Sequence, residues 1–124
     1  MGRDKSEFDQ VLEKALLELP LEFRDALVNV AIVVEDRPSR RLLDELGVSG
    51  DETLYGYYHG IPLSRRSVQD FGELPDAISI YREPLEDDFP DPSELAGEIR
   101  VTLLHEIGHY FGMEEEELEK LGYQ

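Results

Sequence analysis

Two histidines in the C-terminal part of the sequence, His105 and His109, stand four residues apart with Glu106 between them. In an α-helix of 3.6 residues per turn, side chains four apart lie on one face, so both imidazoles can converge on one cation. Imidazole nitrogens are common zinc ligands, and a carboxylate beside them can act as a base. The sequence has only 3 His in 124 residues. The spacing therefore predicts a zinc site with His105 and His109 as ligands and Glu106 as general base, and makes two solvated helix histidines the weaker alternative.

A catalytic zinc site needs a further ligand, since such sites usually have three protein ligands and one water. An acidic run follows the turn expected at Gly112. The spacing H-E-x-x-H-x-x-G-x-x-[ligand], which metzincins use with His in the last position, reaches Glu115. We therefore expect Glu115 to be the third ligand, with Glu116 and Glu114 as the alternatives. The run can also be the solvated first turn of a short helix over 114–121, where acidic side chains favour the positive end of the helix dipole.

The two histidines are expected to lie on a helix over residues 92–111. Asp91 has the character of an N-cap, Pro92 suits the first helical position, and the glycine that follows the segment favours the left-handed conformation that ends helices. Apolar residues fill one half of the helical wheel, whereas both histidines and Thr102 face the other half and Glu106 lies at the border. The helix should therefore bury one side and offer the other to a site.

The segment 98–113 and the residues after it carry the motif H-E-x-x-H-x-x-G-x-x-[DE]. In this, the chain resembles the small bacterial zincin-like metallopeptidases, sometimes called mini-zincins, over nearly its whole length. The resemblance implies a compact single domain in which the motif helix packs on a small sheet. It also implies Zn2+ as the cofactor, with His105, His109 and Glu115 as ligands and Glu106 as the general base.

The composition is that of a single domain over residues 1–124, with 40% hydrophobic residues to build one core. The sequence has no Cys, which excludes disulfides and thiolate-ligated metal and fits a reducing cytoplasm. We expect no membrane association, because no apolar run reaches the roughly 18 residues of a membrane-spanning helix. The formal charge of −17 argues against nucleic acid and anionic membranes as partners, and its field should attract cations and basic substrates.

The rest of the sequence is expected to complete an α+β domain, with helices packed on a small mixed sheet and the site helix near the C-terminus. Three helical patterns precede the site helix, and they cover residues 6–19, with Ser6 as cap and Pro20 as stop, 22–27, and 40–46, ended by Gly47.

Three short runs rich in β-branched or aromatic residues predict strands over 28–35, 53–59 and 77–81. The first run is nearly all apolar, which favours a central strand buried on both faces. The last leads toward the site helix and is expected to be an edge strand that holds an extended peptide by backbone pairing. Between the second and third strands, 60–76 is a loop of a length common in functional lids or mobile segments. Residues 83–91 form a linker or a helical turn.

These features predict zinc-dependent hydrolysis of a peptide or amide bond in a peptide or protein substrate, with Glu106 taking the proton from a metal-activated water. Tyr123, Tyr110 and His59 are candidates for an additional oxyanion donor, although packing or surface roles are favoured for each. The alternative function is a non-catalytic zinc-binding protein in which the metal is structural or regulatory. A third interpretation is an acidic interaction module without metal.

Overall fold

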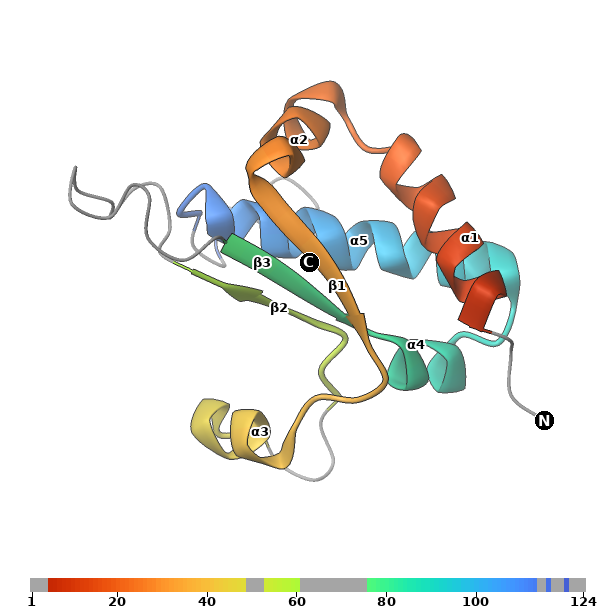
Figure 1. The fold of residues 1–124 in the computed structure, drawn as a ribbon, viewed down its shortest axis with the longest axis vertical. Helices are drawn as coiled ribbons and strands as arrows, with labels where there is room; N and C mark the ends of the chain where they lie inside the picture. Colours follow the sequence, from red (N-terminus) through yellow and green to blue (C-terminus); the bar gives the residue numbers. More distant parts are fainter. Residues whose placement is uncertain (1–4, 49–52, 61–75, 114–115, 117–119, 121–124) are drawn as a thin grey trace.

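The computed structural model describes residues 5–48, 53–60, 76–113, 116 and 120. Its elements, in chain order, are α1 (Lys5–Leu17), α2 (Leu21–Ala26), the 3-10 helix η1 (Leu27–Asn29), β1 (Val30–Glu35), α3 (Arg40–Leu46), β2 (Gly56–His59), β3 (Asp76–Tyr81), α4 (Arg82–Asp88) and α5 (Pro92–Tyr110). Helices packed on a small three-stranded mixed sheet make an α+β domain (Figure 1), which confirms the fold class predicted from the sequence.

The sheet has the strand order β1-β3-β2, so β3 is its centre. β1 runs parallel to β3, and β2 runs antiparallel to it. Ile78 of β3 is paired with Ile32 on one side and with Tyr58 on the other, so these three side chains share one face of the sheet. The same face carries the alternate residues Val30, Val34, Ile80 and Gly56.

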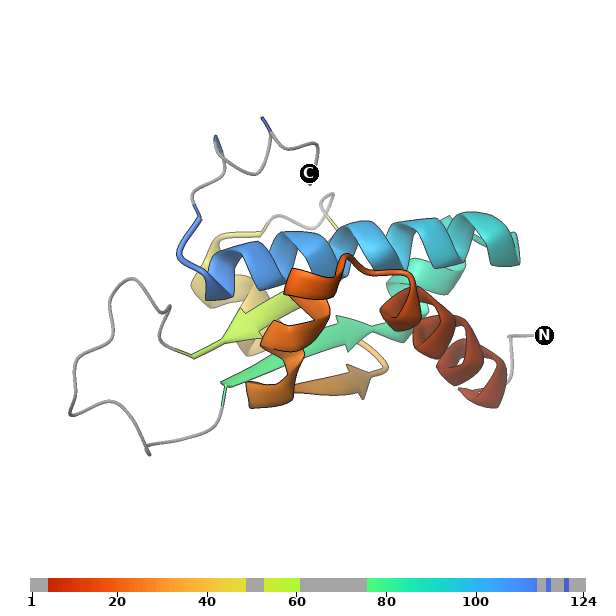
Figure 2. The same ribbon diagram turned by 90° about the horizontal axis from the view of Figure 1, so that it is seen from above.

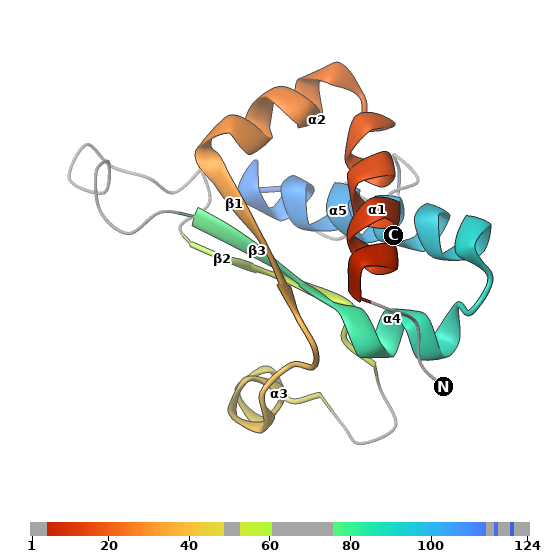
Figure 3. The same ribbon diagram turned by 45° about the vertical axis from the view of Figure 1, so that its right-hand side comes forward.

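α5 covers this face of the sheet, as Figure 2 shows. α1 crosses in front of α5 in Figure 3, and the two helices are in contact. The core between these layers consists of fully buried aliphatic and aromatic side chains, including Phe8, Ala15, Ile78, Ile80, Leu95, Ile99 and Leu103. Because burying each large apolar side chain contributes about 1.5–3 kcal/mol, the packing of α5 on the sheet is a principal source of stability.

Two strands occupy positions different from those expected. β1 lies at an edge, and its outer face is open, with Val33 42% exposed, so the prediction of a central strand was wrong. β3 was expected at an edge and is central, flanked on both sides, so it has no free edge for an extended peptide. An apolar run shows how well a strand can be buried, whereas strand order depends on pairings between distant segments.

The helices lie close to their predicted positions. α3 begins after Ser39, whose hydroxyl accepts the Leu42 N–H, and it ends at Gly47, which has the left-handed φ of 70°. α1 is already helical at Lys5, so Ser6 is not its cap as predicted. The segment expected as a linker or helical turn, residues 83–91, contains all of α4 except its first residue. No helix within the described ranges is long and apolar enough to cross a membrane. Most of the predicted loop, residues 61–75, lies outside the described residues.

Candidate metal centre

α5 is the platform of the candidate site, and local interactions fix both of its ends. At the start, the Asp91 carboxylate accepts the Ser93 N–H at 2.8 Å, so Asp91 is the N-cap that the sequence predicts. At the end, Gly112 has a φ of 87° and donates its N–H to the His109 carbonyl, while Met113 donates to the Gly108 carbonyl, both at 2.9 Å. This pair of bonds is a Schellman motif, and it turns the chain away from the helix axis at Gly112, three residues after His109.

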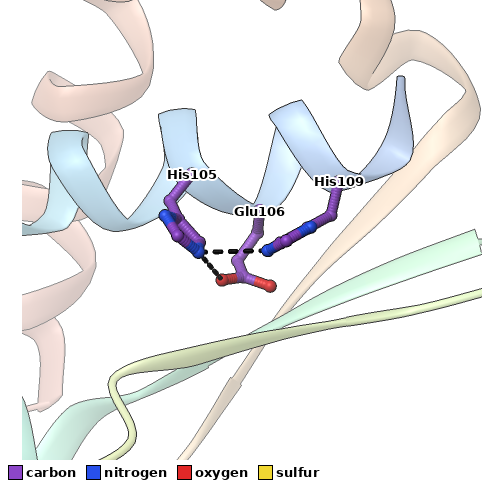
Figure 4. Close-up of side chains that lie close together, drawn as sticks. All are labelled: His105, Glu106 and His109. Carbon is purple, nitrogen blue, oxygen red and sulfur yellow. Dashed lines mark hydrogen bonds and ion pairs between the residues drawn. The ribbon is translucent and has the colours of Figure 1, made fainter. Parts of the chain in front are cut away.

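His105 and His109 lie one turn apart on α5, and their rings converge (Figure 4). The two Nε2 atoms are 3.0 Å apart, and the rings meet edge to face. At this distance the two nitrogens can share one proton, or both can direct lone pairs at one cation. Both rings are partly exposed, so the pair is reachable from outside, as the expected site-facing side of the helix requires.

Glu106 points from α5 toward the sheet, and only 8% of the residue is exposed. Its Oε1 accepts the backbone N–H of Tyr58 at 2.9 Å, and its Oε2 lies 3.9 Å from the Nε2 of His105. β2 is an edge strand, and alternate N–H groups of such a strand point away from its neighbour. The outward N–H of Tyr58 therefore anchors one carboxylate oxygen, and the other oxygen is left on the side of the histidines.

A glycine makes this anchoring possible. A Cβ on Gly56 would lie 2.6 Å from Cγ2 of Thr102, 3.1 Å from the carbonyl oxygen of Ser79 and 3.5 Å from Cγ of Glu106. Only a residue without a side chain lets β2 approach α5 so closely. Sequence reasoning missed both Gly56 and the Tyr58 N–H. A glycine inside the aromatic run 53–59 was the available signal, since an isolated strand glycine indicates a close approach of backbone.

The donor set suits zinc. The donor atoms of His105 and His109 and a carboxylate oxygen of Glu106 all lie within 4.8 Å of one another. Two imidazole nitrogens bound tetrahedrally at about 2.0–2.1 Å from zinc are about 3.3 Å apart, close to the observed 3.0 Å between the histidines. Glu115 and Glu114 lie outside the described residues, and the alternative ligand Glu116 is exposed.

The candidate oxyanion donors have other surroundings. Tyr110 is 5% exposed and packs edge to face against the Tyr58 ring. The His59 Nε2 lies 2.9 Å from the Ser79 hydroxyl, and the strand alternation places both on the sheet face away from α5. Tyr123 lies outside the described residues. The contacts of Tyr110 and His59 agree with the packing and surface roles that the sequence favours.

A cavity of about 270 Å³ adjoins the cluster and is lined by Tyr55, Glu98, Val101, Thr102, His105 and Glu106. Tyr55 donates a hydrogen bond from its hydroxyl to the Asp88 carboxylate at 2.5 Å. Burial, together with this hydrogen bond and the negative charges of Asp88 and Glu98, raises the pKa of Tyr55 to about 12. Tyr55 is therefore a neutral donor at physiological pH.

Comparison with known proteins, like the His105, Glu106 and His109 cluster, indicates a zincin-like protein. Residues 27–123 match the profile of the family described as zincin-like metallopeptidase. A solved structure described as a conserved hypothetical protein from Thermo thermophilus has a TM-score of 0.57 and 22% sequence identity, over 96% of this chain and 97% of that chain. At this identity the likeness shows a shared fold alone. A comparison with curated proteins gave no match.

Proposed function

Since the chain belongs to the zincin-like metallopeptidase family, we propose that it is a zinc-dependent peptidase that hydrolyses peptide or amide bonds. The observation that carries this proposal is the pair of converging Nε2 atoms of His105 and His109, beside a buried carboxylate that the sheet holds in place. A carboxylate oriented by a backbone N–H is suited to moving a proton at a fixed position.

The residues have separate roles in this proposal. His105, His109 and Glu115 hold the ion, which supplies Lewis acidity and lowers the pKa of a water to about 7. Glu106 uses the oxygen on the histidine side to take the proton from the attacking water, and it returns that proton to the leaving amine. The hydrogen bond from the Tyr58 N–H to the other oxygen keeps Glu106 from rotating out of position.

Glu115 is proposed as the third ligand on its spacing from His109. The Schellman motif supports the proposal, because α5 ends at Tyr110, one residue after His109, and the turn at Gly112 leads the chain off the helix axis. Glu115→Gln and Glu116→Gln, compared side by side, identify the acidic ligand: the change at the ligand lowers zinc affinity, and the other change leaves it unaltered. Metal analysis of the purified variants measures this, and His105→Ala is the positive control for loss of zinc.

Cleavage of a broad peptide library tests the function itself. Wild type should cleave some of these peptides, and Glu106→Gln should keep its zinc and lose cleavage, because Gln cannot take the proton. Glu94→Gln is the matched control, since it makes the same chemical change at an exposed position on the first turn of α5. Zinc-loaded wild type that cleaves nothing in the library would favour a structural or regulatory metal instead.

A further inference from the structure

The cavity beside the candidate metal centre extends along α5. Four of its six lining residues, Glu98, Val101, Thr102 and His105, lie on one stripe of the helix at helical spacing. Glu98 and His105 are seven residues apart, about 10 Å along the helix axis. The cavity therefore starts at His105 and runs for two turns toward the start of α5.

The size of the cavity suits a single long side chain. Its volume of about 270 Å³ falls just below the roughly 300–1,000 Å³ of pockets that take drug-sized ligands. Val101 and the Tyr55 ring give it apolar walls. A substrate whose scissile bond lies at His105 and Glu106 can thus place one neighbouring side chain in it.

The far end of the cavity is negatively charged. Glu98 lines the cavity at this end. Tyr55, another lining residue, donates its hydroxyl hydrogen to the Asp88 carboxylate. Both carboxylates act on that hydroxyl electrostatically. Among the described residues, no lysine or arginine forms an ion pair with Glu98, and the nearby Arg100 pairs with Glu18 instead. The Glu98 carboxylate is thus available to a cation that enters the cavity.

We infer that this cavity is a substrate subsite for a lysine or arginine side chain next to the scissile bond, with Glu98 as the residue that determines specificity. A lysine stem of four carbons lies along Val101 and the Tyr55 ring, and its ammonium meets Glu98. The position of this subsite beside a scissile bond rests on the proposed peptidase function. Its preference for a cationic side chain rests on the cavity and the charge of Glu98 alone. The formal charge of −17 attracts cationic segments to the whole molecule but does not direct them to this cavity.

Binding of two small probes tests the subsite without any hydrolysis. Nα-acetyl-lysine methylamide and Nα-acetyl-norleucine methylamide differ in their charged end, and zinc-loaded full-length protein is titrated with each. The amide resonances of Val101 and Thr102 should shift in a saturable way with the lysine probe, which should bind about fivefold more tightly than the norleucine probe. Glu98→Gln should remove this difference, whereas Glu94→Gln, the same change at an exposed position of the same helix, should keep it.

Three outcomes of the titration overturn the inference. They are equal affinity of the two probes, lysine binding that Glu98→Gln leaves unchanged, and resonance shifts confined to residues away from the cavity. Glu98→Lys provides a second check, since it reverses the charge at the same position. It should reject the lysine probe and leave the weaker norleucine binding in place.

Cleavage of matched peptides distinguishes failure of the proposed subsite from failure of the proposed peptidase function. The peptide with lysine beside the scissile bond should have a kcat/KM about fivefold higher than the peptide with norleucine there, because its KM is lower. Glu98→Gln should make the kcat/KM values of the two peptides equal. Equal cleavage of both peptides overturns the subsite and leaves the peptidase standing. Probe binding that depends on Glu98, without cleavage of any peptide, leaves the cationic site standing and overturns the peptidase.

Discussion

The two carboxylate oxygens of Glu106 have different neighbours, and this difference separates its structural role from its chemical one. Oε1 accepts the Tyr58 N–H, and Oε2 lies on the side of His105. Glu106→Gln keeps an oxygen for the N–H, whereas Glu106→Ala removes it and leaves a cavity. We expect Glu106→Ala to lower the free energy of unfolding by about 1–3 kcal/mol more than Glu106→Gln does, because a buried donor loses its acceptor. Urea denaturation measures the difference, and equal stability of the two variants would contradict the anchoring role.

Tyr55 supplies a pH-dependent contribution to stability. Its hydroxyl donates to Asp88, and its pKa is raised from 10.0 to about 12, chiefly by burial. Tyr55→Phe should cost about 0.5–1.5 kcal/mol of unfolding free energy at neutral pH. A raised pKa in the folded state means that the protonated form is favoured there, so the advantage of wild type is complete below about pH 10 and is lost as the pH rises toward about 12.

The check is denaturant unfolding of wild type and Tyr55→Phe at about pH 8 and about pH 11. Tyr81, whose pKa is also raised, first by burial and then by Glu35, is present in both proteins and cancels in the comparison. The stability gap between the two proteins should narrow at the higher pH. A gap that stays constant would show that the Tyr55 hydroxyl does not titrate differently in the folded and unfolded chains.

At the scale of elements, the contact between β2 and α5 decides where Glu106 lies. Gly56→Ala brings a methyl group to 2.6 Å from Cγ2 of Thr102, so we expect it to cost about 1–3 kcal/mol of unfolding free energy. Gly97→Ala on α5 is the control, because a Cβ there meets nothing within 4 Å. It should instead stabilise the helix by up to about 1 kcal/mol.

Thr102→Ser gives this prediction a specific rescue. It removes the methyl group that the new Cβ would meet and keeps the hydroxyl that donates to the Glu98 carbonyl at 2.8 Å. The double variant of Gly56→Ala and Thr102→Ser should therefore be more stable than the sum of the single changes predicts. Additive losses in thermal or urea unfolding would place the strain elsewhere, for example at the Ser79 carbonyl.

The same elements show what the sequence could and could not predict. The start and end of α5 followed from Asp91 and Gly112, since caps act within a few residues of the chain. The convergence of His105 and His109 followed from helical spacing in the same way. Strand order did not follow, because β3 becomes central only through pairings with both β1 and β2. The Tyr58 N–H escaped prediction for the same reason: its partner Glu106 is 48 residues away.

At the scale of the whole molecule, α5 joins the site to the core. One side of the helix buries Leu95, Ile99 and Leu103 completely, and the next stripe carries the partly exposed His105 and His109. The two histidines converge only while the helix is intact. Unfolding of the domain must therefore disperse the proposed ligands, and any ion that binds them stabilises the folded state by mass action.

Zinc should therefore raise the thermal stability of the whole domain. A ligand that binds only the folded chain stabilises it by about 4 kcal/mol at 1,000 times its Kd, so chelation should lower the Tm by several degrees. Since the chain has a formal charge of −17, any divalent cation can also act through the general field. His105→Ala and an equal concentration of Mg2+ separate the two effects. In scanning calorimetry, zinc should raise the Tm of wild type strongly and that of His105→Ala only slightly. Mg2+ should raise the Tm of both proteins only slightly. A zinc shift of equal size in His105→Ala would mean that the acidic surface, and not the histidine pair, accounts for the stabilisation.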